Sequence, residues 1–177
     1  LPQKNKQIKR VFLEPANARA LPEAIQAILH ADVVVVGPGS LYTSIIPNLL
    51  IPGFVDALAE TTALRIFVCN VMTQPGETDG YTASDHVNGL LSHVGTQSIL
   101  DCVVVNKATI SAAQTKMYAR EGAHPVPVDL GGLEKLGFQV HQGDLLDRMD
   151  LVRHDSRKLA AEIMLLASAH GKHKNGE

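Results

Sequence analysis

Short apolar runs alternate with longer stretches of mixed polarity along this chain. The clearest run is Val33–Val36, four consecutive valines, and apolar runs also cover 64–71 and 100–105. Uninterrupted β-branched runs of this length are typical of strands buried on both faces, as in a parallel sheet. Strands that alternate with helices favour right-handed strand–helix–strand units. The pattern therefore predicts an α/β protein with a mostly parallel sheet.

The same pattern assigns the remaining elements. It predicts strands at 8–13, 33–36, 64–71, 100–105 and 138–140, with short strands at 124–128 and 150–152. Helices are predicted over 21–29, 55–63, 82–93, 111–121 and 155–169, with one helical turn over 133–136. Two prolines in 124–128 place that segment at an edge of the sheet or break it early.

A glycine-rich turn directly follows the valine strand. Its candidate ligand-binding residues are Gly37, Gly39, Ser40, Tyr42, Thr43, Ser44 and, farther on, Asn48. Glycines let the backbone approach a ligand closely, and the N–H groups of Gly39 and Ser40 would point at a phosphate. A tight turn required only by packing is the simpler alternative. The turn is neither a Walker P-loop nor a Rossmann glycine fingerprint.

A second polar loop follows the strand at 64–71. Its candidate residues are Asn70, Thr73, Gln74, Glu77 and Thr78, with Asp79 and Tyr81 beyond them. These side chains could bind a sugar or a base edge, and Glu77, Asp79 and Asp85 could hold Mg²⁺ beside a diphosphate. The alternative is a solvated polar loop. Because ligands of parallel sheets bind beyond the carboxyl ends of the strands, the two loops are predicted to form one crevice.

Single residues elsewhere supply weaker candidates. His86 follows the second loop and is placed near the crevice, although a packed or surface histidine is the simpler reading. Tyr118 and Arg153 are usually packing and surface types, but a guanidinium at a strand end would suit a phosphate. No zinc-ligand spacing, nucleophile elbow or assignable Ser/His/Asp triad is found in the sequence.

Composition narrows the class of protein. The chain has 177 residues, 45% hydrophobic and 19% charged, which suggests one domain over 1–177. A net charge of −2 argues against nucleic-acid binding, and no run is long enough to span a membrane. Cys69 and Cys102 lie in apolar runs and are expected to be buried thiols, which suits a reducing cytoplasm. Because residue 1 is not Met, we expect the C-terminal part of a longer protein.

Several segments resemble a known family. They are 37–44, 47–50 and 69–82, supported by 118–123 and 151–155. Together they resemble the YvcK-like gluconeogenesis factors, which belong with the CofD-like 2-phospho-L-lactate transferases. The resemblance extends from Ile8 to Leu166 and implies a Rossmann-like three-layer αβα fold. It also implies a cytoplasmic bacterial protein required for growth and normal cell shape on gluconeogenic carbon sources.

The resemblance implies a ligand as well. YvcK-like members bind UDP-sugars, notably UDP-N-acetylglucosamine, and are linked to peptidoglycan precursor supply. CofD-like members transfer a phospholactyl group from a guanosine diphosphate carrier to a deazaflavin, with Mg²⁺. On the first reading Tyr118 would stack on the base or sugar and Arg153 would bind the diphosphate. The family's N-terminal glycine-rich phosphate loop and acidic catalytic residue have no counterpart in this sequence, so the N-terminal part of the fold is predicted to be missing.

Three functions therefore compete. The first is a nucleotide-sugar-binding regulator without a required cofactor, and the second is a phospholactyl transferase that uses Mg²⁺. The third is an interaction module in which the crevice is a vestige. Assembly of identical chains stays open at this stage.

Overall fold

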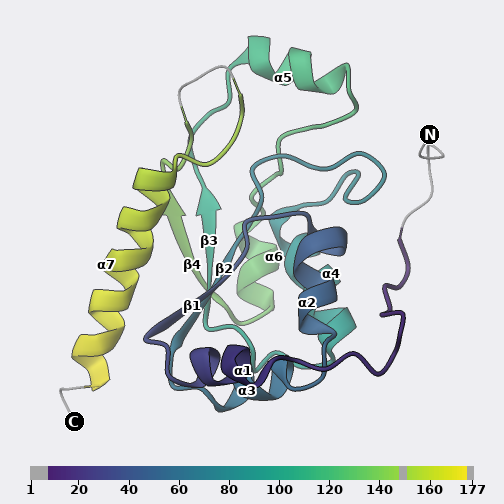
Figure 1. Cartoon of the computed structure of the whole chain (residues 1–177). Helices are drawn as coiled ribbons and strands as arrows, with labels where there is room; N and C mark the ends of the chain where they lie inside the picture. The colour runs from purple at the N-terminus through teal and green to yellow at the C-terminus, as the bar shows by residue number, and fades with distance from the viewer. Residues whose placement is uncertain (1–7, 148–150, 175–177) are drawn as a thin grey trace.

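The computed structural model describes residues 8–147 and 151–174 and confirms the predicted α/β class (Figure 1). The strands are β1 (Val33–Val36), β2 (Leu64–Val68), β3 (Cys102–Asn106) and β4 (Gln139–Gly143). The longer helices are α1 (Pro22–Leu29), α3 (Phe54–Glu60), α4 (Ala83–Val94), α5 (Ala112–Ala119), α6 (Leu130–Lys135) and α7 (Ser156–Lys174). A π-helical turn, η1 (Leu41–Ile45), continues into α2 (Ile46–Leu49).

The four strands form one parallel sheet in the order β1-β2-β3-β4. The registers pair Val33 with Leu64 and Ile66 with Cys102. All strands therefore begin at one end of the sheet and finish at the opposite end. Each connection between two successive strands contains at least one helix, as the alternation of apolar runs predicts. The carboxyl ends of β1 and β2, and hence the two polar loops, are therefore neighbours.

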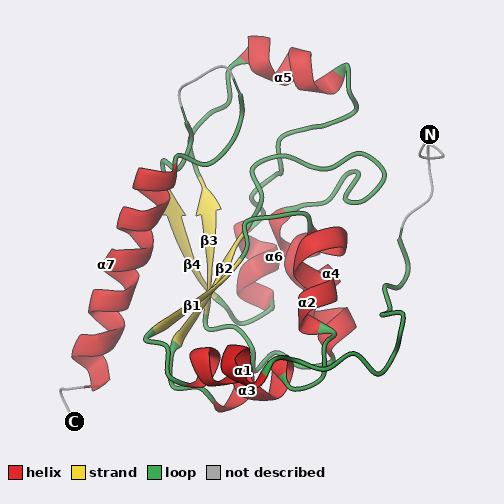
Figure 2. Cartoon of the chain, in the orientation of Figure 1, coloured by secondary structure: helices red, strands yellow, loops and turns green. Residues whose placement is uncertain are grey.

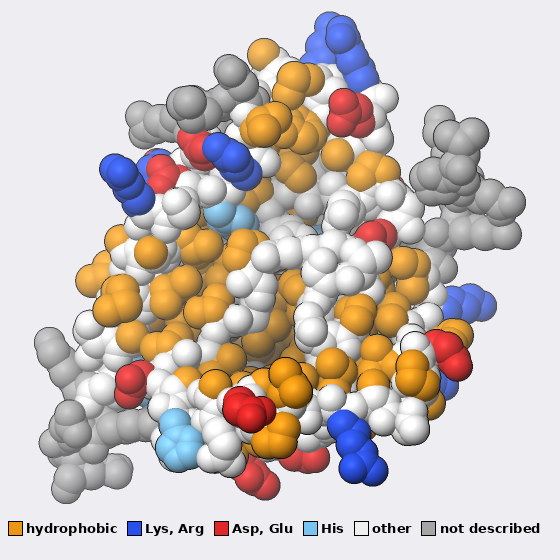
Figure 3. Space-filling model, in the orientation of Figure 1, with side chains coloured by type: hydrophobic (Ala, Val, Ile, Leu, Met, Phe, Trp, Pro, Cys, Tyr) orange, Lys and Arg blue, Asp and Glu red, His pale blue; other side chains and the backbone are white. Residues whose placement is uncertain are grey.

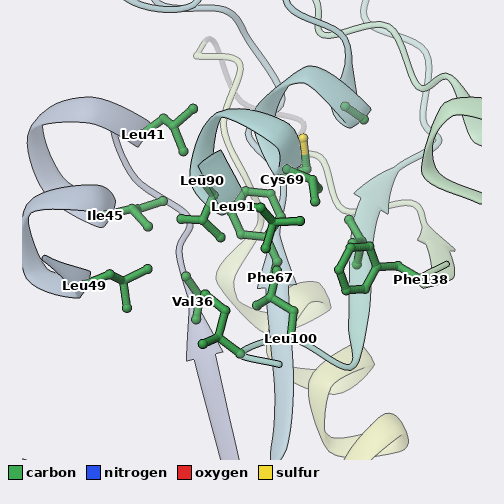
Figure 4. Close-up of a cluster of buried hydrophobic side chains, with 14 of the residues drawn as sticks. Val36, Leu41, Ile45, Leu49, Phe67, Cys69, Leu90, Leu91, Leu100 and Phe138 are labelled. Atoms are coloured by element: carbon green, nitrogen blue, oxygen red, sulfur yellow. The ribbon is translucent and has the colours of Figure 1, made fainter. Parts of the chain in front are cut away.

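Helices cover both faces of the sheet, which gives three layers (Figure 2). On one face, Val36 and Phe67 pack against Leu41 of η1 and Leu90 of α4, and Phe138 completes the cluster beside β4 (Figure 4). The opposite face is formed by another set of side chains: Leu64, Ile66, Val68, Cys102, Val104, Leu145 and Leu159 of α7. Alternate residues of the central strands point to opposite faces, so both faces must be apolar.

The predicted first strand is not present. Residues 8–13 form an irregular segment, and the N–H of Val11 donates to His93 Nε2 at 3.2 Å instead of to a neighbouring strand. Ile8 and Val11 still pack against the core, which explains the apolar alternation. Alternation predicts a half-buried segment here, but not the strand partner that would complete a ladder.

Two short predicted strands are also absent. In 124–128 only Pro125 forms a bridge, with Met72, because Pro125 and Pro127 have no N–H to continue a ladder. In 150–152, Leu151 and Val152 are not in a strand, and position 150 lies outside the described residues. The N–H of Val152 donates to the Tyr118 hydroxyl at 3.0 Å.

The other predicted elements are confirmed with shifted ends. The turn at 133–136 is part of α6, the fragment at 138–140 is part of β4, and α7 extends to Lys174. Thr82 and Asp85 form a reciprocal capping box that begins α4. Cys69 and Cys102 are free, buried thiols, as expected, and burial raises their pKa to about 12 and about 11.

Within the described residues, no single helix has the length and apolar composition of a membrane span. One bent pair, Leu41–Leu49 with Phe54–Glu60, meets the length and composition criterion when its two parts are taken together. Several of its side chains, including Leu41, Ile46 and Leu58, are almost completely buried in the protein core.

Candidate functional site

A crevice of about 640 Å³ lies beyond the carboxyl ends of β1 and β2. Its volume is within the range of about 300–1,000 Å³ typical of small-molecule sites. Seven of the predicted ligand-binding residues line it: Gly39, Ser40, Asn70, Thr73, Gln74, Tyr118 and Arg153. These residues come from four segments of the sequence, at 39–40, 70–74, 118 and 153.

The first wall is the turn after β1. Gly37 has φ +89°, and a Cβ there would lie 3.0 Å from the Val68 carbonyl oxygen. Glycine is therefore required at this position by the backbone. Gly39 is held by Asn70, whose Oδ1 accepts from the Gly39 N–H at 3.3 Å and whose Nδ2 donates to the Gly39 carbonyl at 2.8 Å. The N–H that was expected to face a phosphate is thus bonded to Asn70 in this structure.

Ser40 connects the first wall to the second. Its hydroxyl donates to Glu77 Oε2 at 2.5 Å and accepts from the N–H and the hydroxyl of Thr43, at 3.3 and 2.5 Å. The N–H contact caps η1. This network fixes the spacing of the two loops and leaves Thr43 exposed next to the crevice lining.

Tyr42 does not face the crevice. The side chain is only 4% exposed, packs edge-on against Tyr81 and shares a 2.7 Å hydrogen bond between the two hydroxyl groups. Burial, and then the hydrogen bond to Tyr81, raise the pKa of Tyr42 well above its usual value. Tyr42 therefore acts as a packing residue that connects η1 to the second loop.

Gly37, Ser44 and Asn48 line a separate hollow of about 310 Å³ beside β1. Asn48 Nδ2 donates to the Ser44 carbonyl at 2.7 Å, and both side chains are exposed. The structure therefore separates these three predicted site residues from the main crevice, although Gly39 and Pro38 line both hollows.

Two threonines of the second loop hold the loop itself. Thr73 is 3% exposed, and its Oγ1 accepts from the His124 N–H at 2.9 Å. Thr78 is 1% exposed and accepts from the Gln74 N–H at 2.8 Å. Thr73 reaches the crevice lining, whereas Thr78 supports the loop from behind. Gln74 is exposed and lines the crevice.

The acidic residues proposed for Mg²⁺ are not gathered into a metal site. Within 8–147 and 151–174, no cluster of three or more His, Cys, Asp or Glu side chains could hold a metal ion. Glu77 accepts from Ser40, Asp79 from the Gly76 N–H, and Asp85 from Thr82 as part of the capping box. Asp79 and Asp85 thus support local backbone structure, whereas Glu77 connects the two loops.

His86 is a core residue and not a crevice residue. The imidazole is 1% exposed, stacks edge-on with Tyr81, and its Nδ1 bonds the Thr82 carbonyl at 2.8 Å. Burial holds its pKa below the usual value. The prediction that His86 lies near the crevice was therefore wrong and its alternative, a packed histidine, is confirmed, because His86 lies on the buried face of α4 with Val87 and Leu90.

The far wall carries Tyr118 and Arg153. The Tyr118 hydroxyl accepts from the Val152 N–H, which leaves its ring as part of the lining. Arg153 is 63% exposed, and its Nε donates to Asp147 Oδ2 at 3.1 Å. The guanidinium has donors beyond this one bond that a phosphate could use.

Sequence reasoning did not select His154 and Glu121, which also line the crevice. His154 directly follows Arg153, and its segment was noted only as supporting the resemblance. The sequence offered one indication of His154, namely its position next to Arg153. A residue adjacent to a candidate phosphate-binding residue is itself a candidate for the same site.

Comparison with known proteins identifies relatives of this chain. The family model for 2-phospho-L-lactate transferase CofD matches residues 1–146. A gluconeogenesis factor from Halalkalibacterium halodurans is 46% identical over 93% of this chain and 51% of that protein. The gluconeogenesis factor of Bacillus subtilis is 42% identical over 91% of this chain and 51% of its own length.

Solved structures agree. The crystal structure of a UPF0052 family member from Bacillus halodurans has a TM-score of 0.88 and 45% identity, and it covers 92% of this chain and 53% of that one. The chain thus spans about half the length of the two gluconeogenesis factors named above. On the family match and these identities, the chain belongs to the CofD family and, within it, is similar to the gluconeogenesis factors.

Proposed function

We propose that the crevice binds a nucleotide sugar, with UDP-N-acetylglucosamine as the representative ligand, and that the protein is a regulator of the gluconeogenesis-factor type, required for growth and cell shape on gluconeogenic carbon sources. The single observation that carries the proposal is the convergence of Gly39, Ser40, Asn70, Tyr118 and Arg153 on one hollow of about 640 Å³. Its position at the carboxyl ends of parallel strands is where such sheets bind ligands.

The chemistry of the lining suits such a ligand. Arg153 provides guanidinium donors for a diphosphate, and the Tyr118 ring provides an apolar face for a base or sugar. Asn70 and Gln74 offer neutral donors and acceptors for hydroxyl groups. The names of the two gluconeogenesis factors compared above support the regulatory part of the proposal.

Calorimetry tests the proposal on the protein expressed from its complete reading frame. UDP-N-acetylglucosamine should release heat on binding, and Arg153→Ala should weaken the affinity by about tenfold or more, since charged hydrogen bonds contribute about 1.5–3 kcal/mol. Arg157→Ala is the matched control, because Arg157 is exposed on α7 and lies outside the crevice lining. No heat at millimolar ligand would refute the proposal.

A phospholactyl transferase is the second candidate, and the description of the matching family model favours it. This activity requires a phospholactyl donor, a deazaflavin acceptor and Mg²⁺. A turnover assay with those three components, with and without the metal, separates the two functions. Turnover that depends on Mg²⁺ would assign the transferase, whereas binding of the UDP-sugar without turnover supports the regulator.

A further inference from the structure

Two side chains that line the crevice carry a formal charge at neutral pH, Arg153 and Glu121. The charge of Arg153 is already shared with Asp147, through the 3.1 Å bond from its Nε. Glu121 is exposed, and its carboxylate has no hydrogen bond or ion pair with any residue that the structure describes. The crevice lining therefore contains one negative charge that no described group neutralises.

The main chain around Glu121 is fixed beside the crevice. Glu121 closely follows α5, which lies beyond the carboxyl ends of the strands (Figure 1). Its N–H donates to the Tyr118 carbonyl at 2.9 Å. Three residues farther on, the His124 N–H donates to Thr73 Oγ1 at 2.9 Å, and the Thr73 N–H donates to the His124 carbonyl at 2.7 Å. Glu121 is thus held between two other residues of the crevice lining, Tyr118 and Thr73, while its side chain stays accessible.

A carboxylate at this position distinguishes between the groups of a ligand. Its oxygens only accept hydrogen bonds, so it binds hydroxyl groups and repels phosphates and other carboxylates. Arg153 presents donors only, and these match the oxygens of a diphosphate. A ligand with both kinds of group should therefore place its diphosphate at Arg153 and its hydroxyl groups at Glu121.

We infer that Glu121 faces the sugar of the bound nucleotide sugar and selects an uncharged sugar over an acidic one. The inference rests on the proposed function and narrows its class of ligand. A hydrogen bond between the exposed carboxylate and a sugar hydroxyl replaces a bond to water, so it adds little net affinity. A carboxylate on the sugar would instead meet a like charge, which lowers the affinity directly. Glu121 therefore acts mainly through the ligands that it excludes.

A matched pair of ligands measures this exclusion. UDP-N-acetylglucosaminuronate has a carboxylate in place of the C6 hydroxymethyl group of UDP-N-acetylglucosamine and is otherwise identical to it. Calorimetry at about pH 7.5, on the protein expressed from its complete reading frame, should show about tenfold or more weaker binding of the acidic ligand. Glu121→Gln keeps the size of the side chain and removes its charge, so the ratio of the two affinities should fall to within about threefold. Glu134→Gln is the matched control, because it removes an exposed charge of α6 outside the crevice lining, and it should leave the ratio unchanged.

Salt provides a measurement that needs no variant. Raising the NaCl concentration from about 50 mM to about 500 mM should bring the two affinities of the unaltered protein closer together, because salt screens the repulsion from an exposed carboxylate. The effect of salt on the contact between Arg153 and the diphosphate is common to both ligands and cancels in the ratio. Equal affinities of the unaltered protein for the two ligands, or a ratio that E121Q leaves unchanged, would overturn the inference and leave the proposed function intact. If the unaltered protein does not bind UDP-N-acetylglucosamine, the proposed function fails and the inference fails with it.

Discussion

The two ends of the sheet differ in how their polar groups are used. At the amino end, Arg65 of β2 bonds both carboxylate oxygens of Asp101 and the carbonyls of Leu58 and Ser98. At the carboxyl end, Arg153 has one bond from its Nε to Asp147 and is 63% exposed, and Nε2 of His154 has no partner among the described residues. The Arg65–Asp101 pair at the amino end is bonded within the protein, whereas Arg153 at the carboxyl end has guanidinium donors left for a ligand.

The difference separates stability from function within one sheet. The side chains of Arg65 and Asp101 are 17% and 33% exposed, so their interaction is partly shielded from water. Although burial opposes it, the hydrogen bonds from Arg65 hold the pKa of Asp101 below its usual value.

Figure 3 shows charged side chains around the periphery of one face of the molecule, with apolar and uncharged groups nearer its centre. A charge that is fully bonded within the protein stabilises the fold and has little left for a ligand.

The largest expected effect comes from breaking the amino end. Arg65→Ala leaves the Asp101 carboxylate and the Leu58 carbonyl without their donors, and should lower the free energy of unfolding by about 2–3 kcal/mol. Urea unfolding measures this loss. The folded fraction should still bind UDP-N-acetylglucosamine with unchanged affinity. A large loss of affinity at unchanged stability would contradict the division between the two ends.

A smaller effect on stability is expected at Gly37, because the backbone of the turn after β1 requires a glycine there. Gly37→Ala places a Cβ 3.0 Å from the Val68 carbonyl oxygen at φ +89° and should cost about 1–3 kcal/mol. Gly39→Ala is the matched control, since its Cβ would lie 3.7 Å from the Cβ of Ser44, an ordinary contact. That variant should unfold within about 0.5 kcal/mol of the unaltered protein. Equal thermal unfolding of the two variants would show that the turn after β1 adapts freely.

The sheet and the crevice were predictable from the sequence because each depends on a local pattern, the apolar runs and the polar loops that follow them, which can be recognised without knowing the tertiary structure. The four valines do form a strand, but the expected burial on both faces was wrong, because β1 is the outer strand of the described sheet and Val35 is 38% exposed. Polar loops after neighbouring parallel strands must meet at the same end of the sheet. Asn70 and Ser40, assigned on this basis, do lie together in the crevice. Residues 8–13 show the limit of the method, since apolar alternation cannot reveal whether a partner strand exists.

The sequence did not predict the directions in which the side chains after Gly39 point. The hydroxyl residues after Gly39 were treated as one surface, but they form a helical turn in which successive side chains point in different directions. Tyr42 therefore enters the core while Thr43 and Ser44 face solvent. In α4, His86 shares the buried helical face with Leu90, and the four-residue spacing between them was a usable signal.

The smallest expected effect is a pH dependence that originates at two histidines, His86 in the core and His154 at the crevice. Burial lowers the pKa of His86 and of His154 in the folded protein, whereas the unfolded chain titrates near the ordinary histidine value of about 6.5. Below about pH 6.5 the unfolded state therefore binds protons that the folded state does not, and stability falls as the pH falls. Each histidine can contribute at most about 1.4 kcal/mol per pH unit in this range.

His86→Asn tests the share of the core histidine, because asparagine can keep the hydrogen bond to the Thr82 carbonyl but cannot be protonated. Unfolding free energies measured at about pH 7.5 and about pH 5.5 should fall less in the variant than in the unaltered protein. The loss of packing is common to both conditions and cancels in this difference. If the two proteins lose the same free energy between these conditions, His86 does not contribute. The pH response would then be assigned to His154 at the crevice.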